Sequence, residues 1–246
     1  MNNPFTLVGK KILVTGASAG IGRGIAVACA GMGARVILTA RNTERLQETL
    51  SQLEGDGHTY IAADLTNEAE RRALVEQLPM LDGVVQCAGV GSRVPCKMLT
   101  QADLDFVMKP NIEAPILLQS ELLSEKKIKK QASIVYIASA AATMPTVGNA
   151  VYSASKAAII AYAKCLAQEL APRMVRVNCI SPTMVWTDLA TSTLSVEQLK
   201  EVEKTYPLKR LGTSKDIAYL TVYLLSDASS WMTGSNVEIT GGSQIG

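Results

Sequence analysis

The chain has 246 residues, of which 48% are hydrophobic and 19% charged, and its formal net charge is +2. This composition excludes a disordered chain, and a nearly neutral protein has no basic stripe of the kind that binds nucleic acid. No span approaches the ~20 apolar residues of a membrane helix, and the N-terminus lacks the charged-then-apolar order of a signal peptide. We therefore expect a globular, cytoplasmic protein with no membrane or nucleic-acid partner.

Cysteine, histidine and lysine usage excludes several kinds of site. Five cysteines are an odd number without C-x-x-C spacing, and four of them lie in apolar segments, so we expect reduced core thiols. These four are Cys29, Cys87, Cys165 and Cys179. The single histidine, His58, supports neither a His-based triad nor a His-rich metal site, and we expect no bound metal. The basic run 126–130 is interpreted as a solvated helix end.

The first forty residues predict a strand, a glycine-rich turn, a helix and a second strand. A β-branched strand over 11–16 leads through Gly16-Ala-Ser-Ala-Gly-Ile-Gly22 into a helix. Gly33 ends that helix, and 34–39 is a second apolar strand. This βαβ unit implies a parallel sheet. Its glycines would let a pyrophosphate reach the amide groups and the positive end of the helix.

The rest of the chain continues the alternation of helices and strands. We expect helices over 43–53, 68–78, 100–127 with a break at Pro110, 152–170 and from 214, and strands over 59–63, 82–87, 133–138, 176–180 and 236–240. The pattern predicts one α/β domain over 1–246, a Rossmann-type doubly wound parallel sheet of about seven strands with helices on both faces. Residues 187–206 are polar and helical, which suits a mobile cover over a site.

Polar and glycine-rich loops follow six of the expected strands. They cover 16–22, 40–42, 64–66, 88–92, 139–149 and 181–187. Ligands of doubly wound sheets bind beyond the carboxyl ends of the strands, so these loops would line one crevice.

The residue after the second strand indicates which dinucleotide is preferred. An acidic side chain there would bind the free adenosine ribose of NAD, whereas an arginine favours the 2′-phosphate of NADP. The chain has Ala40-Arg41 and no acid before Glu44, so we favour NADP(H) over NAD(H). Asp64 and Leu65 follow the third strand, where they are placed to meet the adenine edge.

Tyr152 and Lys156 are four residues apart at the start of a helical run. This spacing places both side chains on one helix face. A cation close to a phenol favours the phenolate, which makes a tyrosine usable as an acid or base near neutral pH. The spacing is also common on ordinary exposed helix faces, so the hypothesis of a catalytic pair depends on the other motifs.

These motifs together closely resemble the short-chain dehydrogenase/reductase family over nearly the whole chain. The residues that carry the resemblance are Thr15 to Gly22, Ala88-Gly89, Asn111, Ser139, Tyr152 with Lys156, Ser181-Pro-Thr with Thr187, Pro207 to Gly212, Ser226-Asp, Thr233-Gly-Ser and Gly241-Gly242. The resemblance implies an NADP-dependent oxidoreductase that acts on carbonyl or hydroxyl groups.

The resemblance also assigns four catalytic residues. Tyr152 would be the general acid that protonates the carbonyl oxygen in reduction and the base in oxidation. Lys156 would hold the nicotinamide ribose and stabilise the phenolate, and Ser139 would donate a hydrogen bond to the substrate oxygen. Asn111 would retain a water that links Lys156 to solvent, because the kink at Pro110 exposes a backbone carbonyl.

The expected cofactor contacts come from five of the six loops and from three of the catalytic residues. They are Gly16, Ser18, Ala19, Gly20, Ile21, Gly22, Arg41, Asp64, Leu65, Ala88, Gly89, Asn111, Tyr152, Lys156, Pro182, Val185 and Thr187.

The chain departs from the family pattern in two loops. Gln86-Cys87 stands where the family usually has Asn-Asn, so we expect the bonds that brace this loop to be replaced. Pro182-Thr183 replaces the commoner Pro-Gly, a variant similar to that of dicarbonyl/L-xylulose reductases. Four apolar residues could form a pocket wall or pack into the core. They are Met144, Pro145, Val185 and Trp186.

Three functions remain open. The first is an NADPH-dependent reductase of a small ketone, sugar or dicarbonyl, homotetrameric as in much of the family. The second is a 3-oxoacyl-(acyl-carrier-protein) reductase, which needs a basic docking surface to which Lys209 and Arg210 could contribute. The third is a catalytically silent NADP-binding regulator, against which the complete catalytic set argues.

Overall fold

The computed structural model describes residues 3–191 and 194–243, and its centre is a seven-stranded parallel sheet in the order β3-β2-β1-β4-β5-β6-β7. Its strands are β1 (Lys11–Thr15), β2 (Arg35–Ala40), β3 (Thr59–Ala62), β4 (Leu81–Gln86), β5 (Ile128–Ile137), β6 (Arg176–Pro182) and β7 (Asn236–Ile239). The strand order reverses between β1 and β4, which is where ligands of doubly wound sheets bind. The predicted fold class is confirmed.

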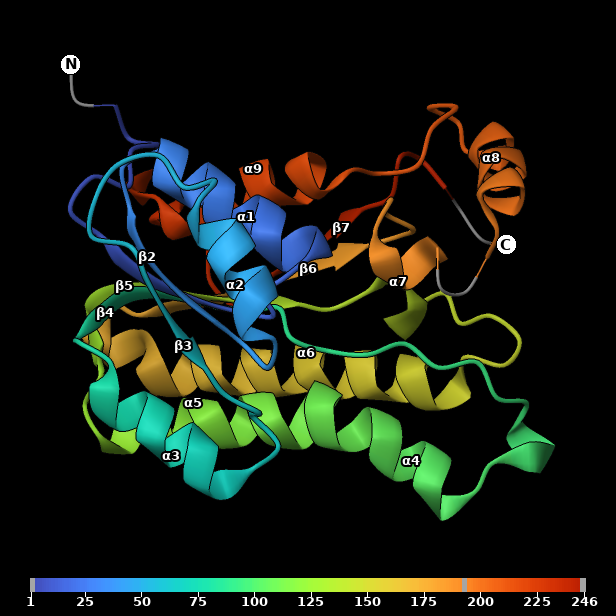
Figure 1. Cartoon of the computed structure of the whole chain (residues 1–246), viewed down its shortest axis with the longest axis horizontal. Helices are drawn as coiled ribbons and strands as arrows, with labels where there is room; N and C mark the ends of the chain where they lie inside the picture. Colours follow the sequence, from blue (N-terminus) through green and yellow to red (C-terminus); the bar gives the residue numbers. More distant parts are fainter. Residues whose placement is uncertain (1–2, 192–193, 244–246) are drawn as a thin grey trace.

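Helices cover both faces of the sheet (Figure 1). Helices α1 (Gly20–Gly31), α2 (Thr43–Leu50) and α9 (Ser214–Leu225) lie on one face, and α3 (Glu68–Gln77), α4 (Gln101–Met108), α5 (Ala114–Ser124) and α6 (Ala150–Leu170) lie on the other. Two further helices, α7 (Asp188–Thr191) and α8 (Val196–Thr205), stand at the carboxyl-end edge of the sheet. They confirm that the segment 187–206 is helical, although 192–193 lie outside the described residues.

The alternation of side chains along the central strands creates a core on each face of the sheet. In β1, Leu13 points into the core beneath α5 and α6, whereas Ile12 and Val14 point into the core beneath α1 and α9. All three side chains are fully buried. A third, smaller cluster lies apart from both cores and is formed by Leu199, Tyr206 and Leu211.

The long helix expected over 100–127 is divided into three parts. A π-helical segment, Lys109–Glu113, separates α4 from α5. Pro110 lies within it, as predicted, because proline has no N–H to donate to the helical ladder. The π-helical turn makes Asn111 a buried residue directed toward the neighbouring loop.

The interpretation of the basic run 126–130 as a helix end is wrong. Helix α5 ends at Ser124, and β5 already begins at Ile128. The Lys127 ammonium donates to the Leu78 carbonyl at 2.6 Å, where it binds the C-terminal end of α3. Lys129 forms an ion pair with Asp82 at 2.8 Å. The middle of the basic run is therefore structural.

One of the four cysteines expected in the core is exposed. Cys29 and Cys179 are buried and Cys87 is half-buried, but Cys165 lies on the outer face of α6. Its Sγ is 3.4 Å from a Glu169 carboxylate oxygen, one helical turn away. The prediction failed for Cys165 because an apolar helix of this length has an exposed stripe as well as a buried one. Within the part of the chain that the structure describes, no helix has the length and apolarity needed to cross a membrane.

Candidate active site

The turn after β1 can be built only with glycine at two positions. Gly16 has a φ of +66°, and a Cβ there would lie 2.9 Å from the Ala88 Cα. A Cβ on Gly22 would lie 2.2 Å from the Gly16 carbonyl oxygen. The first turn of α1 is therefore pressed against the end of β1, and its free N–H groups are available to an anion.

Thr15 braces the loop after β4, where the usual Asn-Asn pair is absent. Its hydroxyl accepts hydrogen bonds from the N–H groups of Cys87 and Ala88, both at 3.0 Å. The Gln86 side chain instead turns toward α5, where its amide donates to the Pro115 carbonyl at 3.5 Å. Burial raises the pKa of the Cys87 thiol to about 12, against the opposing charge of Lys156. A neutral thiol thus stands beside the candidate site.

Arg23 holds the glycine turn from the side, a role that sequence reasoning missed. Its guanidinium donates to the Ser18 carbonyl at 2.6 Å and to the Thr49 hydroxyl at 2.9 Å. The Thr49 hydroxyl in turn donates to the Ala17 carbonyl at 2.9 Å. The backbone of the turn is therefore fixed to α2. An exposed-looking arginine in a helix gives no signal of this in the sequence.

Arg41 and Asp64 follow the carboxyl ends of two neighbouring strands, β2 and β3. Both N–H and hydroxyl of Thr66 donate to one Asp64 carboxylate oxygen, at 2.9 and 2.8 Å. Burial alone would raise the pKa of Asp64, but these hydrogen bonds and the charge of Arg41 lower it below its usual value. The pair therefore presents a cation and a carboxylate at one corner of the crevice.

The side chain of Leu65 does not face that corner. It is buried in the core beneath α5 and α6, so only its backbone could meet a ligand. The Leu65 carbonyl accepts a hydrogen bond from Arg71 at 3.0 Å. Arg71 is itself buried and paired with Glu121 at 2.9 Å. Sequence reasoning missed Arg71 because its partners lie on a different helix.

Tyr152 and Lys156 lie on the first two turns of α6. The Lys156 Nζ is 5.8 Å from the centroid of the Tyr152 ring. Lys156 is buried, and its ammonium donates to the Ile137 carbonyl at 2.9 Å. This bond fixes the cation at the carboxyl end of β5, beside the phenol.

Asn111 connects the loop after β4 to α6. Its amide oxygen accepts from the Val90 N–H at 2.8 Å, and its amide nitrogen donates to the Val90 carbonyl at 3.0 Å and to the Ser155 hydroxyl at 3.1 Å. The Ser155 hydroxyl then donates to the Tyr152 carbonyl at 2.7 Å. Sequence reasoning did not anticipate Ser155, the buried link between Asn111 and the helix that carries Tyr152.

Ser139 follows β5 and begins a short 3₁₀ turn, Ala140–Ala142. Its Oγ accepts from the Ala141 N–H at 3.1 Å. Because this contact uses a lone pair, the hydroxyl proton is left to donate elsewhere. The bond orients the hydroxyl and keeps it chemically available.

The loop after β6 combines core packing with contacts to the crevice. Pro182 is buried at the end of β6, and the Thr183 hydroxyl donates to the Thr240 carbonyl at 3.2 Å, which ties the loop to β7. The Val185 side chain is buried in the core beneath α1, so it forms no pocket wall. The Thr187 Cγ2 lies 3.2 Å from the point that a Cβ on Gly20 would occupy.

Trp186 belongs to the small cluster beneath α8. Its indole N–H donates to a Glu203 carboxylate oxygen at 2.7 Å, and the Leu211 N–H donates to the same oxygen at 3.2 Å. Met144 is half-buried and Pro145 exposed. These two residues remain candidates for an apolar wall.

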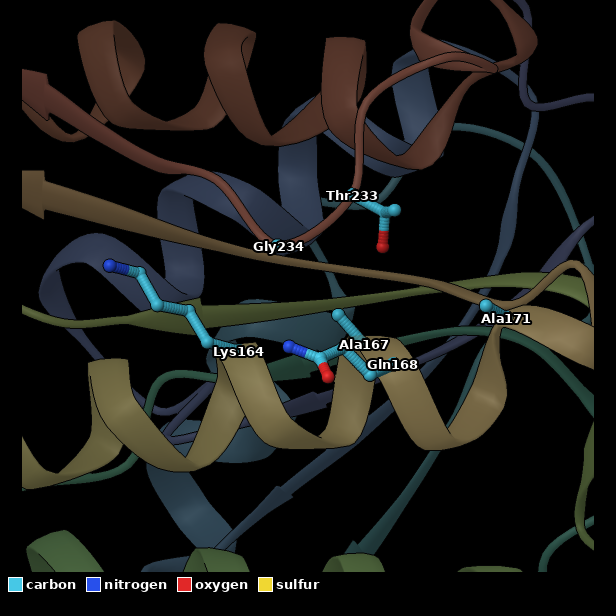
Figure 2. A pocket seen from close by; sticks show the side chains of 6 residues that line it. All are labelled: Lys164, Ala167, Gln168, Ala171, Thr233 and Gly234. Carbon is cyan, nitrogen blue, oxygen red and sulfur yellow. The ribbon is translucent and has the colours of Figure 1, made fainter.

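A separate pocket of about 350 Å³ lies between the second half of α6 and the loop before β7 (Figure 2). It is lined by Lys164, Ala167, Gln168, Ala171, Thr233 and Gly234. Lys164 is about 12 Å further along α6 than Lys156, at 1.5 Å per residue. The pocket is thus distant from the catalytic candidates. No cluster of three or more potential metal ligands occurs within residues 3–191 and 194–243.

Known proteins are similar to this chain over almost its whole length. A family model described as enoyl-(acyl carrier protein) reductase matches residues 16–244. The chain is 34% identical over 245 residues to an L-xylulose reductase of Caenorhabditis elegans, covering 97% of each protein. It is 32% identical over 236 residues to a 3-oxoacyl-(acyl-carrier-protein) reductase of Rickettsia conorii, covering 96% of this chain and 97% of that protein.

One similar solved structure contains a bound dinucleotide. It is a putative NAD(P)-dependent gluconate 5-dehydrogenase from Beutenbergia cavernae with NADP at low occupancy. The two chains are 30% identical, the TM-score is 0.87, and 98% of each chain is covered.

Proposed function

The chain belongs to the short-chain dehydrogenase/reductase family of oxidoreductases, which bind a nicotinamide cofactor and act on CH–OH and C=O groups, and we propose that it is an NADPH-dependent reductase of a ketone. The observation that carries the proposal is the chain of hydrogen bonds from Val90 through Asn111 and Ser155 to Tyr152. These hydrogen bonds fix the start of α6, which carries both Tyr152 and the buried Lys156 ammonium. We therefore favour an enzyme of this class over a catalytically silent NADP-binding regulator.

The residues of the crevice fit a nicotinamide dinucleotide. The glycine turn leaves no room for side chains at Gly16 and Gly22, so backbone N–H groups face the place of a pyrophosphate. Arg41 and Asp64 would meet the adenosine. Gly89 lies beside the Asn111 and Lys156 side chains, where a larger residue would obstruct the nicotinamide ribose. Ser18, Ala19, Ile21, Ala88, Pro182 and Thr187 complete the proposed contacts, with Leu65 and Val185 contributing through backbone atoms.

The catalytic residues would act on the oxygen of the substrate. NADPH supplies, when bound, the hydride that reduces the carbonyl carbon. Ser139 donates a hydrogen bond to the carbonyl oxygen, and the Tyr152 hydroxyl gives it a proton. Lys156 stabilises the resulting phenolate, since an opposite charge favours the ionised form. Asn111 holds the loop and a water through which the proton is replaced. In oxidation, Tyr152 takes the proton instead.

Replacement of Tyr152 tests this mechanism. Tyr152→Phe should lower kcat with a panel of ketones and 3-oxoacyl thioesters by at least about a hundredfold, the size of a general-acid contribution. NADPH binding, followed by fluorescence titration, should stay nearly unchanged. Tyr219→Phe, on the exposed surface of α9, is the matched control and should keep full turnover. Turnover that survives the loss of the Tyr152 hydroxyl would rule out the mechanism.

Cofactor preference depends on Arg41. We propose that its guanidinium binds the 2′-phosphate of NADPH. Arg41→Asp should weaken NADPH binding far more than NADH binding, because the new carboxylate repels the phosphate and can accept from the ribose hydroxyls. Arg72→Asp, which changes an exposed arginine on α3, should alter neither affinity. Equal losses of NADPH and NADH affinity would show that Arg41 does not bind the phosphate.

A small ketone, sugar or dicarbonyl is the substrate class that we favour. A carrier-protein substrate requires free cations beside the crevice, and Arg210 is already bound bidentately to Asp216, at 2.8 and 2.9 Å. The Lys209 ammonium donates to the Lys204 carbonyl at 2.9 Å. The 3-oxoacyl thioesters in the substrate panel provide the direct comparison. Faster reduction of carrier-bound substrates than of free ketones would favour the second candidate.

We also propose that the protein is a cytoplasmic homotetramer. Trp231, which is fully exposed, and Phe106, which is 58% exposed, are aromatic side chains of the kind enriched at subunit interfaces. Sedimentation velocity at micromolar concentration tests the assembly. A monomer under those conditions would contradict it.

A further inference from the structure

Arg45 and Asp188 form an ion pair between two elements that flank the crevice from opposite sides. Arg45 lies in the first turn of α2, which follows β2, and Asp188 begins α7, which follows β6. The Arg45 Nη1 donates to a carboxylate oxygen of Asp188 at 3.4 Å. In Figure 1, α7 stands at the carboxyl-end edge of the sheet, apart from α2.

The ion pair crosses the reversal point of the sheet. Three strands, β1, β4 and β5, lie between β2 and β6. At about 4.8 Å per strand, the two strand ends are about 19 Å apart. The Arg45 and Asp188 side chains and the loop after β6 together span this distance. A dinucleotide that occupies the crevice would therefore lie beneath the contact.

The neighbouring residue makes a second contact over the same crevice. Thr187 lies against Gly20, with its Cγ2 3.2 Å from the place of a glycine Cβ. Its hydroxyl accepts from the Ala190 N–H at 3.3 Å and so begins α7. Two consecutive residues thus fasten α7 to the two elements that would face the pyrophosphate and the adenosine.

We propose that the Arg45–Asp188 pair holds α7 across the crevice and slows the release of the bound nicotinamide cofactor. Both residues are positioning residues, which act through the placement of α7. The inference rests on the proposed function only for the identity of the ligand. It separates Arg45 from Arg41, which precedes α2 and to which we assign the 2′-phosphate.

The expected effect is modest, because both side chains are more than half exposed, at 53% and 73%. Exposed ion pairs change an equilibrium by a factor of about 1.4 to 5. The effect should also weaken as salt is added, since the Debye length falls to about 3 Å at 1 M.

Release rates of NADPH and NADH, measured by stopped-flow fluorescence, test the proposal. Asp188→Asn and Arg45→Gln should each speed the release of both cofactors by about 1.4- to 5-fold, and the double variant should add little more. The exchanged pair, Arg45→Asp with Asp188→Arg, should restore slow release. Asp105→Asn breaks an exposed ion pair between α4 and Lys109 of the π-helical segment, and it should leave release unchanged.

Hydrogen exchange in cofactor-free protein gives a second measurement that does not depend on the proposed function. Both single variants should speed exchange of the α7 amides to a similar extent, and the exchanged pair should reverse this. Unchanged exchange and unchanged release would each overturn the proposal. So would an Arg45→Gln variant that speeds only NADPH release while Asp188→Asn slows it, because Arg45 would then be a phosphate ligand. Failure of the proposed function looks different: the unsubstituted protein would bind neither cofactor.

Discussion

Gly89 allows two catalytic candidates to approach the same point. A Cβ at this position would lie 2.9 Å from the Asn111 Oδ1 and 3.5 Å from the Lys156 Nζ. Asn111 cannot move aside cheaply, because it is buried and makes three hydrogen bonds to Val90 and Ser155. The backbone at Gly89 needs no left-handed conformation, so the requirement for glycine there is one of space.

Gly89→Ala should therefore lower kcat without preventing folding. The new methyl group displaces the Asn111 amide and crowds Lys156, and a displacement well below 1 Å is enough to reduce kcat by about tenfold or more. Steady-state kinetics with a ketone measures the loss. Gly31→Ala is the matched control, because the nearest atom to its Cβ is a Glu54 oxygen at 3.9 Å. A full kcat in Gly89→Ala would show that the space beside Asn111 is not needed.

Residues with a local reason for their identity were predictable from the sequence. Gly16 and Gly22 follow from the geometry of a strand-turn-helix, so their spacing alone indicated the turn. Arg23 and Arg71 were not predictable, because each also binds a partner more than one element away, Thr49 for Arg23 and Glu121 for Arg71. Both look like ordinary surface charges in a helical segment. Their bonds exist only once the helices pack.

The start of α9 is fixed by a carboxylate with four donors. Asp216 accepts two hydrogen bonds from the Arg210 guanidinium and two from Thr213, through its N–H and hydroxyl. The bonds from Arg210 are the main reason that the pKa of Asp216 lies well below its usual value. Partial burial acts in the opposite direction, and Thr213 lowers the pKa further. Helix α9 then packs against α1, where a Cβ on Gly24 would meet Ser214 at 2.6 Å.

Asp216→Asn should lower the Tm at neutral pH, and the deficit should shrink only in strong acid. A carboxyl whose pKa is lowered on folding stabilises the native state above its unfolded-state pKa of about 3.9, and this stabilisation is lost as the pH falls through the native value. Thermal unfolding of Asp216→Asn and of the unsubstituted protein, followed by circular dichroism from about pH 7 to about pH 2, measures the deficit. At neutral pH the asparagine loses the charge-assisted bonds of the arginine.

Asp103→Asn is the control for the helix cap. Asp103 forms the same capping box with Thr100 at the start of α4, and those hydrogen bonds lower its pKa, but no arginine binds it. Asp103→Asn should lower the Tm less than Asp216→Asn does. As the pH falls, the effect of Asp103→Asn should disappear at a higher pH than that of Asp216→Asn. Identical pH profiles for the two variants would mean that the Arg210 bonds add nothing.

The order of elements was predictable, but some element ends were not. Strand β5 begins at Ile128 rather than at 133, because Ile128 already pairs with Leu81 of β4. The pairing of the two strands is irregular between this point and Ser133, and Gln131 has a φ of +62°. A lysine-rich run gives no apolar alternation, so a sequence pattern cannot reveal such an irregular strand. The break at Pro110 was predictable, because the missing N–H acts locally.

Across the whole molecule, the buried apolar side chains form three separate clusters. The sheet separates the two large cores, and the third, small cluster lies in the segment after β6. The two large cores share the central strands, so loss of either exposes the same sheet. The cluster of Leu199, Tyr206 and Leu211 shares no strand with them. Glu203 fastens it to Trp186, because this carboxylate accepts from the indole at 2.7 Å, a bond that also lowers the pKa of Glu203. We therefore predict that α8 and this cluster open locally while the sheet stays folded, which a cover over a site requires.

Two leucines with the same burial separate local from global unfolding. Leu199 of α8 and Leu118 of α5 are both fully buried, and truncation of a buried leucine to alanine costs about 2–5 kcal/mol. Leu118→Ala should lower the global Tm, because its core is continuous with the sheet. Leu199→Ala should leave the Tm nearly unchanged but speed hydrogen exchange in α8 selectively. The substitution lowers the free energy of local opening of α8 and not that of global unfolding. If Leu199→Ala instead lowers the Tm as much as Leu118→Ala, and exchange in α8 and β4 changes together, α8 unfolds with the sheet and cannot act as an independent cover.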